Sequence, residues 1–241
     1  MDLELEFGTS MRKLVIAAIS VLAVAVLLVA GYECYILRTA ESLLADVKAL
    51  KLGESSFEEA SGVAAKYARF RVVGWGSVPA SQDPRENNFP GDICSPDRCL
   101  FAFAVNNLSL YPFHIVRCTE FSAEFAVLNG KVQYADVHLH GGPECNYGGF
   151  VEEVNPRDDV DHKAYSFRTP VGKPYLRISL TQQAPTALRD RAFALNMHCM
   201  IAMRGCDEPC DYLPLLWNDW KADLADKGGA AVLKTTYPRC P

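Results

Sequence analysis

The chain has 241 residues, and its 24 Lys and Arg against 29 Asp and Glu give a formal net charge of −5 at pH 7. No basic block or Lys/Arg stripe occurs in it, which argues against nucleic acid or anionic lipid as the main partner. Beyond an apolar N-terminal segment about 200 residues remain, enough for a domain with a hydrophobic core of its own.

The apolar segment covers residues 14–32 and contains no charge over nineteen residues. At about 1.5 Å per residue, a helix of this length spans about 28 Å, close to the roughly 30 Å hydrocarbon core of a bilayer. A buried core helix would show a polar face, and this segment has none. The segment therefore predicts a transmembrane signal anchor, with the lipid bilayer as its partner.

The charges that flank the anchor predict its orientation. Arg12 and Lys13 come directly before it, whereas Glu33 follows it and Arg38 is the first cation beyond. The positive-inside rule then makes residues 1–13 a cytoplasmic tail. It places the rest of the chain outside the cytoplasm, in a periplasmic or extracellular compartment.

Two alternatives concern this end of the chain. A cleaved signal peptide could end near Val29-Ala30-Gly31, although its apolar region is usually shorter, about 7–15 residues. Met11 is also a start for an exported protein, so residues 1–10 are a candidate start-site artefact. A retained anchor is the preferred interpretation.

Cysteine usage indicates an oxidising compartment, because an even number of external cysteines is typical of a disulfide framework. Eight of the nine cysteines lie beyond the anchor: Cys94, Cys99, Cys118, Cys145, Cys199, Cys206, Cys210 and Cys240. One pairing, Cys94 with Cys99, is predicted because Ser95 and Pro96 suit a turn between them; the other pairings stay open. Cys34, at the membrane exit, is predicted to be free or packed, with an intermolecular bridge as the alternative.

Residues 33–70 predict a helical stalk and hairpin. Apolar residues recur at steps of three and four across 36–52, which predicts a helix whose apolar face docks on the domain. A homodimer through this stalk is the alternative interpretation. Overlapping capping boxes begin at Ser55 and Ser56 and predict a second helix, so the two helices would form an αα-hairpin.

Residues 71–241 predict an extracytoplasmic domain of the α+β class, with an antiparallel sheet, flanking helices and disulfides. A Pro- and Gly-rich stretch at 74–98, with Trp75 and Phe89, is interpreted as a long, ordered loop. Asn129-Gly130 is the strongest hairpin signal in the chain. Strands are predicted at 100–105, 120–128, 131–140, 163–168 and 175–181.

The C-terminal third adds helices to this sheet. Residues 187–196 predict a helix and 197–203 are compatible with either a strand or a helix. Residues 211–226 predict one helix whose apolar stripe is core: Leu213, Leu216, Trp217, Trp220 and Leu224. An edge strand is predicted at 232–236.

The one metal-like spacing is His138-Leu139-His140. Residues two apart on a strand point the same way, so both imidazoles and Asp136 could reach one ion. Val132 and Tyr134 are assigned to the same face. Without a third firm ligand these are weak candidates, and the solvated face of a hairpin is the preferred interpretation.

Two other clusters are weaker candidates for metal binding. The carboxylates of 158–162 lack the pattern of a calcium loop. Cys199, Cys206 and Cys210 with His198 lack the spacing of a zinc site, so disulfides are preferred.

No nucleophile elbow, P-loop or dinucleotide fingerprint occurs, and no cofactor is predicted. The preferred hypothesis is a membrane-anchored, non-catalytic binding or interaction module. The alternative is a tethered hydrolase or metal-dependent enzyme that uses His138, His140 and nearby carboxylates.

Overall fold

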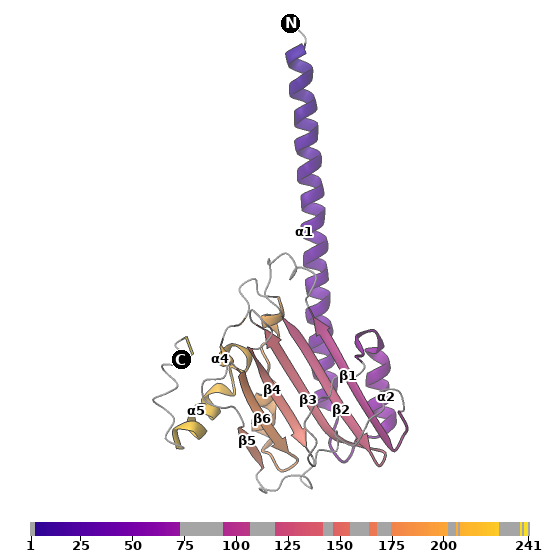
Figure 1. Cartoon of the computed structure of the whole chain (residues 1–241), viewed down its shortest axis with the longest axis vertical. Coiled ribbons are helices and arrows are strands. Elements are labelled where there is room, and N and C mark those ends of the chain that lie inside the picture. Colours follow the sequence, from indigo (N-terminus) through magenta and orange to yellow (C-terminus); the bar gives the residue numbers. More distant parts are fainter. Residues whose placement is uncertain are drawn as a thin grey trace.

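The structure is a computed structural model of the whole chain. It describes residues 3–72, 94–106, 119–141, 147–154, 164–167, 175–201, 206, 208–226, 237 and 239–240, with the backbone alone for 3–10, 147 and 154. The fold is α+β: a long apolar helix leads into a six-stranded mixed sheet with flanking helices (Figure 1).

Helix α1 runs without interruption from Leu3 to Ala49 (Figure 1). Its segment Met11–Ala49 contains an 18-residue window with a mean hydropathy of 2.9, none of it buried inside the protein. In the described part of the chain this is the one helix long and apolar enough to cross a membrane. Its length and composition suggest membrane anchoring.

The second part of α1 belongs to the domain itself. Ile36, Ala40, Leu43 and Val47 recur at helical spacing and are at most 2% exposed, within the same core as the sheet. The predicted docking of this apolar face is therefore confirmed. A homodimer through this helix remains a prediction, and it would have to use the exposed side because the apolar side is covered.

Helix α2, Phe57–Lys66, begins with a capping box formed by Ser56 and Glu59, and the 3₁₀ helix η1, Ala68–Phe70, follows it. Asp46 of α1 accepts hydrogen bonds from Lys66 Nζ at 2.7 Å and from the hydroxyl of Tyr67 at 2.6 Å. These contacts tie the two helices together as the predicted hairpin.

The sheet has the strand order β1-β2-β3-β4-β6-β5. The strands are β1 (Arg98–Asn106), β2 (Glu120–Leu128), β3 (Lys131–Gly141), β4 (Tyr147–Val154), β5 (Tyr165–Phe167) and β6 (Tyr175–Thr181). The prediction of a wholly antiparallel sheet is wrong at one place, because β4 and β6 are parallel. The connection of residues 155–174 is long enough for the crossover that parallel strands need.

The β2–β3 hairpin follows its turn signal. Asn129 and Gly130 have φ of 54° and 74°, the left-handed region that a two-residue hairpin turn requires. The pairing shifts register between Ala126 and Val127, which leaves Gln133 as an extra residue on β3. This bulge turns Val132 onto the core face with Ala135, so the predicted grouping of Val132 with Tyr134 is wrong.

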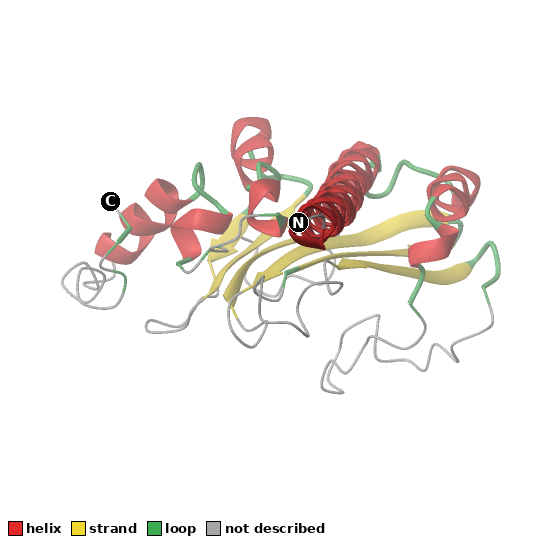
Figure 2. Ribbon diagram, turned by 90° about the horizontal axis from the view of Figure 1, so that it is seen from above, coloured by secondary structure: helices red, strands yellow, loops and turns green. Residues whose placement is uncertain are grey.

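The described helices line one face of the sheet, and the core lies between them and that face (Figure 2). They include α3 (Thr186–Ala192), the 3₁₀ helix η4 (Met197–Met200), α4 (Pro209–Tyr212) and α5 (Trp217–Asp226). The predicted stripe of 211–226 is buried core. The prediction of a single helix there is wrong because Pro214 interrupts it.

Three disulfides lie within the described residues. They join Cys94 to Cys99, the pair that the sequence singled out, Cys199 to Cys206, and Cys210 to Cys240. Such bonds suggest an oxidising, extracytoplasmic compartment. Cys34 is exposed and free.

Candidate functional site

The sheet face opposite the helices carries polar and aromatic side chains in register, and we call it the polar face. Paired positions on neighbouring strands lie side by side on one face, and the pairing of β2, β3, β4 and β6 aligns three rows. The rows are Glu124, Asp136, Glu152 and Ser179; Ser122, His138, Phe150 and Arg177; and Glu120, His140, Gly148 and Tyr175.

Asp136 is the centre of a small hydrogen-bonded group on β3. Its Oδ2 lies 3.1 Å from Nε2 of His138 and accepts a hydrogen bond from the hydroxyl of Tyr134. The Asp136 side chain is 3% exposed, whereas that of His138 is 29% exposed. The carboxylate is therefore held inside, and it presents an oriented imidazole to the surface.

A second polar group lies across β4 and β6. Arg177 Nη2 donates to Oε2 of Glu152 at 3.0 Å, and Ser179 Oγ donates to the same oxygen at 2.8 Å. Glu152 is 5% exposed at its side chain and Arg177 is 36% exposed. As at Asp136, a buried carboxylate orients a side chain that reaches solvent.

Aromatic rings fill the space between these two groups. The ring of Phe150 lies 4.7 Å from that of His138, 4.9 Å from that of His140 and 5.3 Å from that of Tyr175. All four side chains are partly exposed. The polar face thus combines an aromatic centre with oriented charges.

Electrostatics at this site favour a protonated His138. Burial by itself lowers the pKa of the imidazole, but the charge of Asp136, its hydrogen bond and the charge of Glu124 raise it. Arg177 opposes them, and the net result is a pKa above the ordinary value of 6.5. Burial also raises the pKa of Glu120, while the charge of His138 lowers it in part.

We expect the raised pKa of His138 to make stability depend on pH. The stabilisation is complete below 6.5, the value for the unfolded chain, and is lost as the pH rises through the higher folded value. Urea unfolding at pH 6 to 9 should therefore show a loss of stability in the wild-type protein that His138→Gln abolishes. His198→Gln, at an exposed position in η4, should keep the wild-type profile. A His138→Gln variant with an unchanged profile would contradict the assignment.

The metal candidates share a face as predicted, but their ligand atoms do not converge. His138 and His140 have ring centroids 5.5 Å apart. Together with Asp136 they do not form a set whose ligand atoms all lie within 4.8 Å of one another. Within the described residues Glu208, Cys210 and Cys240 form such a set, and the two sulfurs are bonded to each other.

Searches against known protein families, curated proteins and solved structures find no match to this chain. Function is therefore argued from the residues and their geometry.

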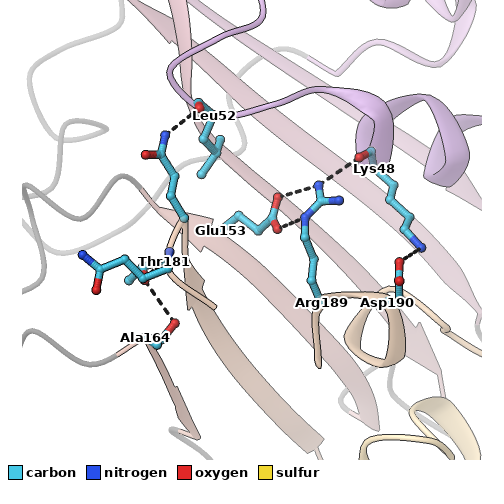
Figure 3. Close-up of polar contacts among 9 residues, drawn as sticks. Lys48, Leu52, Glu153, Ala164, Thr181, Arg189 and Asp190 are labelled. Atoms are coloured by element: carbon cyan, nitrogen blue, oxygen red, sulfur yellow. Dashed lines mark hydrogen bonds and ion pairs between the residues drawn. The ribbon is translucent and has the colours of Figure 1, made fainter. Parts of the chain in front are cut away.

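A cavity of about 610 Å³ lies on the helix-bearing side, where the end of α1 meets β6 and α3. Glu153 and Arg189 form part of its wall, and Arg189 also donates to the Lys48 carbonyl oxygen at 2.9 Å (Figure 3). Arg189 binds both carboxylate oxygens of Glu153. Because these charges neutralise each other, we assign the Glu153–Arg189 pair a structural role: it joins α1, β4 and α3.

Several predicted features lie outside the described residues: Cys118, Cys145, Trp75, Phe89, residues 158–162 and the strand at 232–236. Conversely, sequence reasoning missed Phe150, Glu152, Tyr175 and Arg177 as site residues. Alternation along 175–181 could have placed Tyr175, Arg177 and Ser179 on one face. Their position beside β3 depends on the parallel pairing with β4, which no local signal indicates.

Proposed function

We propose that this protein is a membrane-anchored binding module whose disulfide-containing domain lies outside the cytoplasm, and that a protein partner docks on the polar face. The anchor is Leu14 to Tyr32 within α1, with Arg12 and Lys13 on the cytoplasmic side. The domain needs no cofactor for this role.

One observation carries the proposal: the aromatic centre of Phe150 and Tyr175 lies beside the oriented Arg177 on a face that the described helices leave open. Protein interfaces are enriched in aromatic residues and arginine, and their strongest contributions come from such side chains. Glu152 holds Arg177 in place before a partner arrives, which reduces the entropy lost on binding.

Site-specific photocrosslinking in the native membrane tests the proposal. The photoreactive residue p-benzoylphenylalanine at position 150 should give a covalent adduct with a partner, and Arg177→Glu should abolish that adduct. The same residue at position 215, where Leu215 is 55% exposed in the turn before α5, is the matched control. No adduct at position 150, or the same adduct at position 215, would refute docking on the polar face.

The alternative is a tethered hydrolase or metal-dependent enzyme, and the Asp136–His138 hydrogen bond favours it because a carboxylate that orients an imidazole is a feature of general-base sites. In the described part of the chain, however, no serine or cysteine side chain is hydrogen-bonded to His138. Stoichiometric zinc in the purified chain that is lost on His138→Ala would favour the enzyme over the binding module.

A further inference from the structure

The domain begins almost at the end of the proposed membrane span. Ile36, the first buried core residue of α1, comes four residues after Tyr32, or about 6 Å along the helix axis at about 1.5 Å per residue. The helix is continuous through this point (Figure 1). No flexible linker separates the domain from the span, so residues around Tyr35 are fixed at the membrane surface.

Arginine and aromatic side chains form a cluster around Tyr35, just beyond the proposed span. Tyr32 and Tyr35 are each 41% exposed, and the ring of Tyr35 lies 6.3 Å from that of Phe70 in η1. The guanidinium of Arg69 lies 5.5 Å from the centroids of both Tyr35 and Phe70. Arg38 follows Tyr35 by three residues and therefore lies on the same side of α1. We call Arg38, Arg69 and Tyr35 the juxtamembrane cluster.

The two arginines of this cluster lack a carboxylate partner among the residues that the structure describes. Two cations of neighbouring positions do have one: Lys66, at the end of α2, lies 2.7 Å from Asp46, and Lys48, near the end of α1, lies 2.7 Å from Asp190. Both Arg38 and Arg69 are exposed. Within the described residues, the two guanidinium groups are therefore available to an anionic ligand outside the domain.

The geometry places these charges within reach of lipid headgroups. Tyr35 lies about 4.5 Å beyond Tyr32 along the axis, and each headgroup layer is roughly 5–7 Å thick. Side chains of a helix tilt toward its N-terminus, which here is the direction of the membrane. The long stem of Arg38 can therefore carry its guanidinium back to the headgroups, and tyrosine rings favour the same interface.

We propose that the juxtamembrane cluster binds the phosphate of anionic phospholipid headgroups, with Arg38 and Arg69 as the phosphate ligands and Tyr35 as the ring that positions Arg69. Guanidinium groups match phosphate in charge and in bidentate geometry. This binding would also fix the rotation of the domain about α1, and with it the direction in which the polar face points. The inference rests on the proposed membrane anchoring.

Lipid retention by the full chain tests this inference. The chain is extracted into mild detergent from membranes that contain equal amounts of phosphatidylglycerol and phosphatidylcholine, and the lipids that remain bound are counted by native mass spectrometry. The wild-type chain should retain phosphatidylglycerol selectively. Arg38→Gln and Arg69→Gln should each weaken that retention about 5-fold, the effect of roughly one basic contact with an anionic headgroup.

A matched control uses Lys51→Gln, which removes an exposed cation two residues beyond the C-terminal end of α1, far from the proposed span. It should retain phosphatidylglycerol as the wild type does. If the Arg38→Gln/Arg69→Gln variant retained as much phosphatidylglycerol as the wild type, or if the wild type showed no preference for this lipid, lipid binding by the cluster would be refuted. The proposed membrane anchoring would not be affected by either result. A chain that carbonate extraction releases from membranes would refute the anchoring as well, so the two failures are distinguishable.

Discussion

Replacing Arg189 with leucine is expected to lower the free energy of unfolding by about 3–5 kcal/mol, the usual cost of leaving one partner of a buried ion pair alone. Glu153 is 6% exposed at its side chain, and Arg189 contacts both of its carboxylate oxygens (Figure 3). The variant would leave that carboxylate in the interior without its cation. It would also remove the donor to the Lys48 carbonyl at the end of α1. Urea unfolding of the full chain in detergent measures the loss.

The same helix supplies the control. Arg191 lies two residues farther along α3 and pairs with Asp219 at 2.8 Å, but the two side chains are 39% and 33% exposed. Solvent screens such a pair, so Arg191→Leu should cost no more than about 1 kcal/mol. A double variant, Glu153→Leu with Arg189→Leu, should recover most of the stability because it buries no lone charge. Equal losses for Arg189→Leu and Arg191→Leu would show that burial of Glu153 does not matter.

Local signals in the sequence predicted local structure well. Asn129-Gly130 predicted the β2–β3 hairpin because few dipeptides tolerate two consecutive left-handed residues. The three- and four-residue spacing of apolar side chains likewise predicted which side of α1 is buried. In each case the cause acts within a few residues, so the sequence alone contains it.

Strand β4 was missed because its glycines resemble a loop. Their presence in a strand has a cause elsewhere in the fold: a Cβ at Gly149 would lie 2.8 Å from the Leu213 side chain, and one at Gly148 would lie 2.5 Å from the Leu139 carbonyl oxygen. Close approach to α4 and β3 therefore excludes side chains there. No local signal near Gly149 indicates that Leu213, more than sixty residues farther along the chain, will lie against it.

The candidate site was predictable only in part for the same reason. Alternation along β3 placed Asp136, His138 and His140 on one face. The aromatic centre and Arg177 come from β4 and β6, and their pairing with β3 is long-range. The bulge at Gln133 also reversed the face of Val132, which shows how one extra residue changes an assignment by alternation.

The second large effect concerns α1, where we expect Leu43→Ala to lower the free energy of unfolding of the domain by about 2–5 kcal/mol. Leu43 is fully buried against the sheet, so its loss leaves a cavity in the core. Leu22→Ala makes the same change on the same helix, at a residue that is 65% exposed within the proposed span, and it should change unfolding of the domain by less than about 0.5 kcal/mol. Urea unfolding of the full chain, followed by near-ultraviolet circular dichroism, compares the two.

The comparison also bears on the two interpretations of the N-terminus. Cleavage after Gly31 would leave Ile36, Leu43 and Val47 in the mature chain, so the core would keep its helix whether the anchor is retained or removed. A large effect of Leu43→Ala with a small effect of Leu22→Ala would show that α1 has two separable roles, a span and a core element. If Leu43→Ala were as mild as Leu22→Ala, the helix would not be part of the domain core. The fixed placement of the juxtamembrane cluster would then lose its physical basis, because that placement depends on a helix that cannot rotate against the sheet.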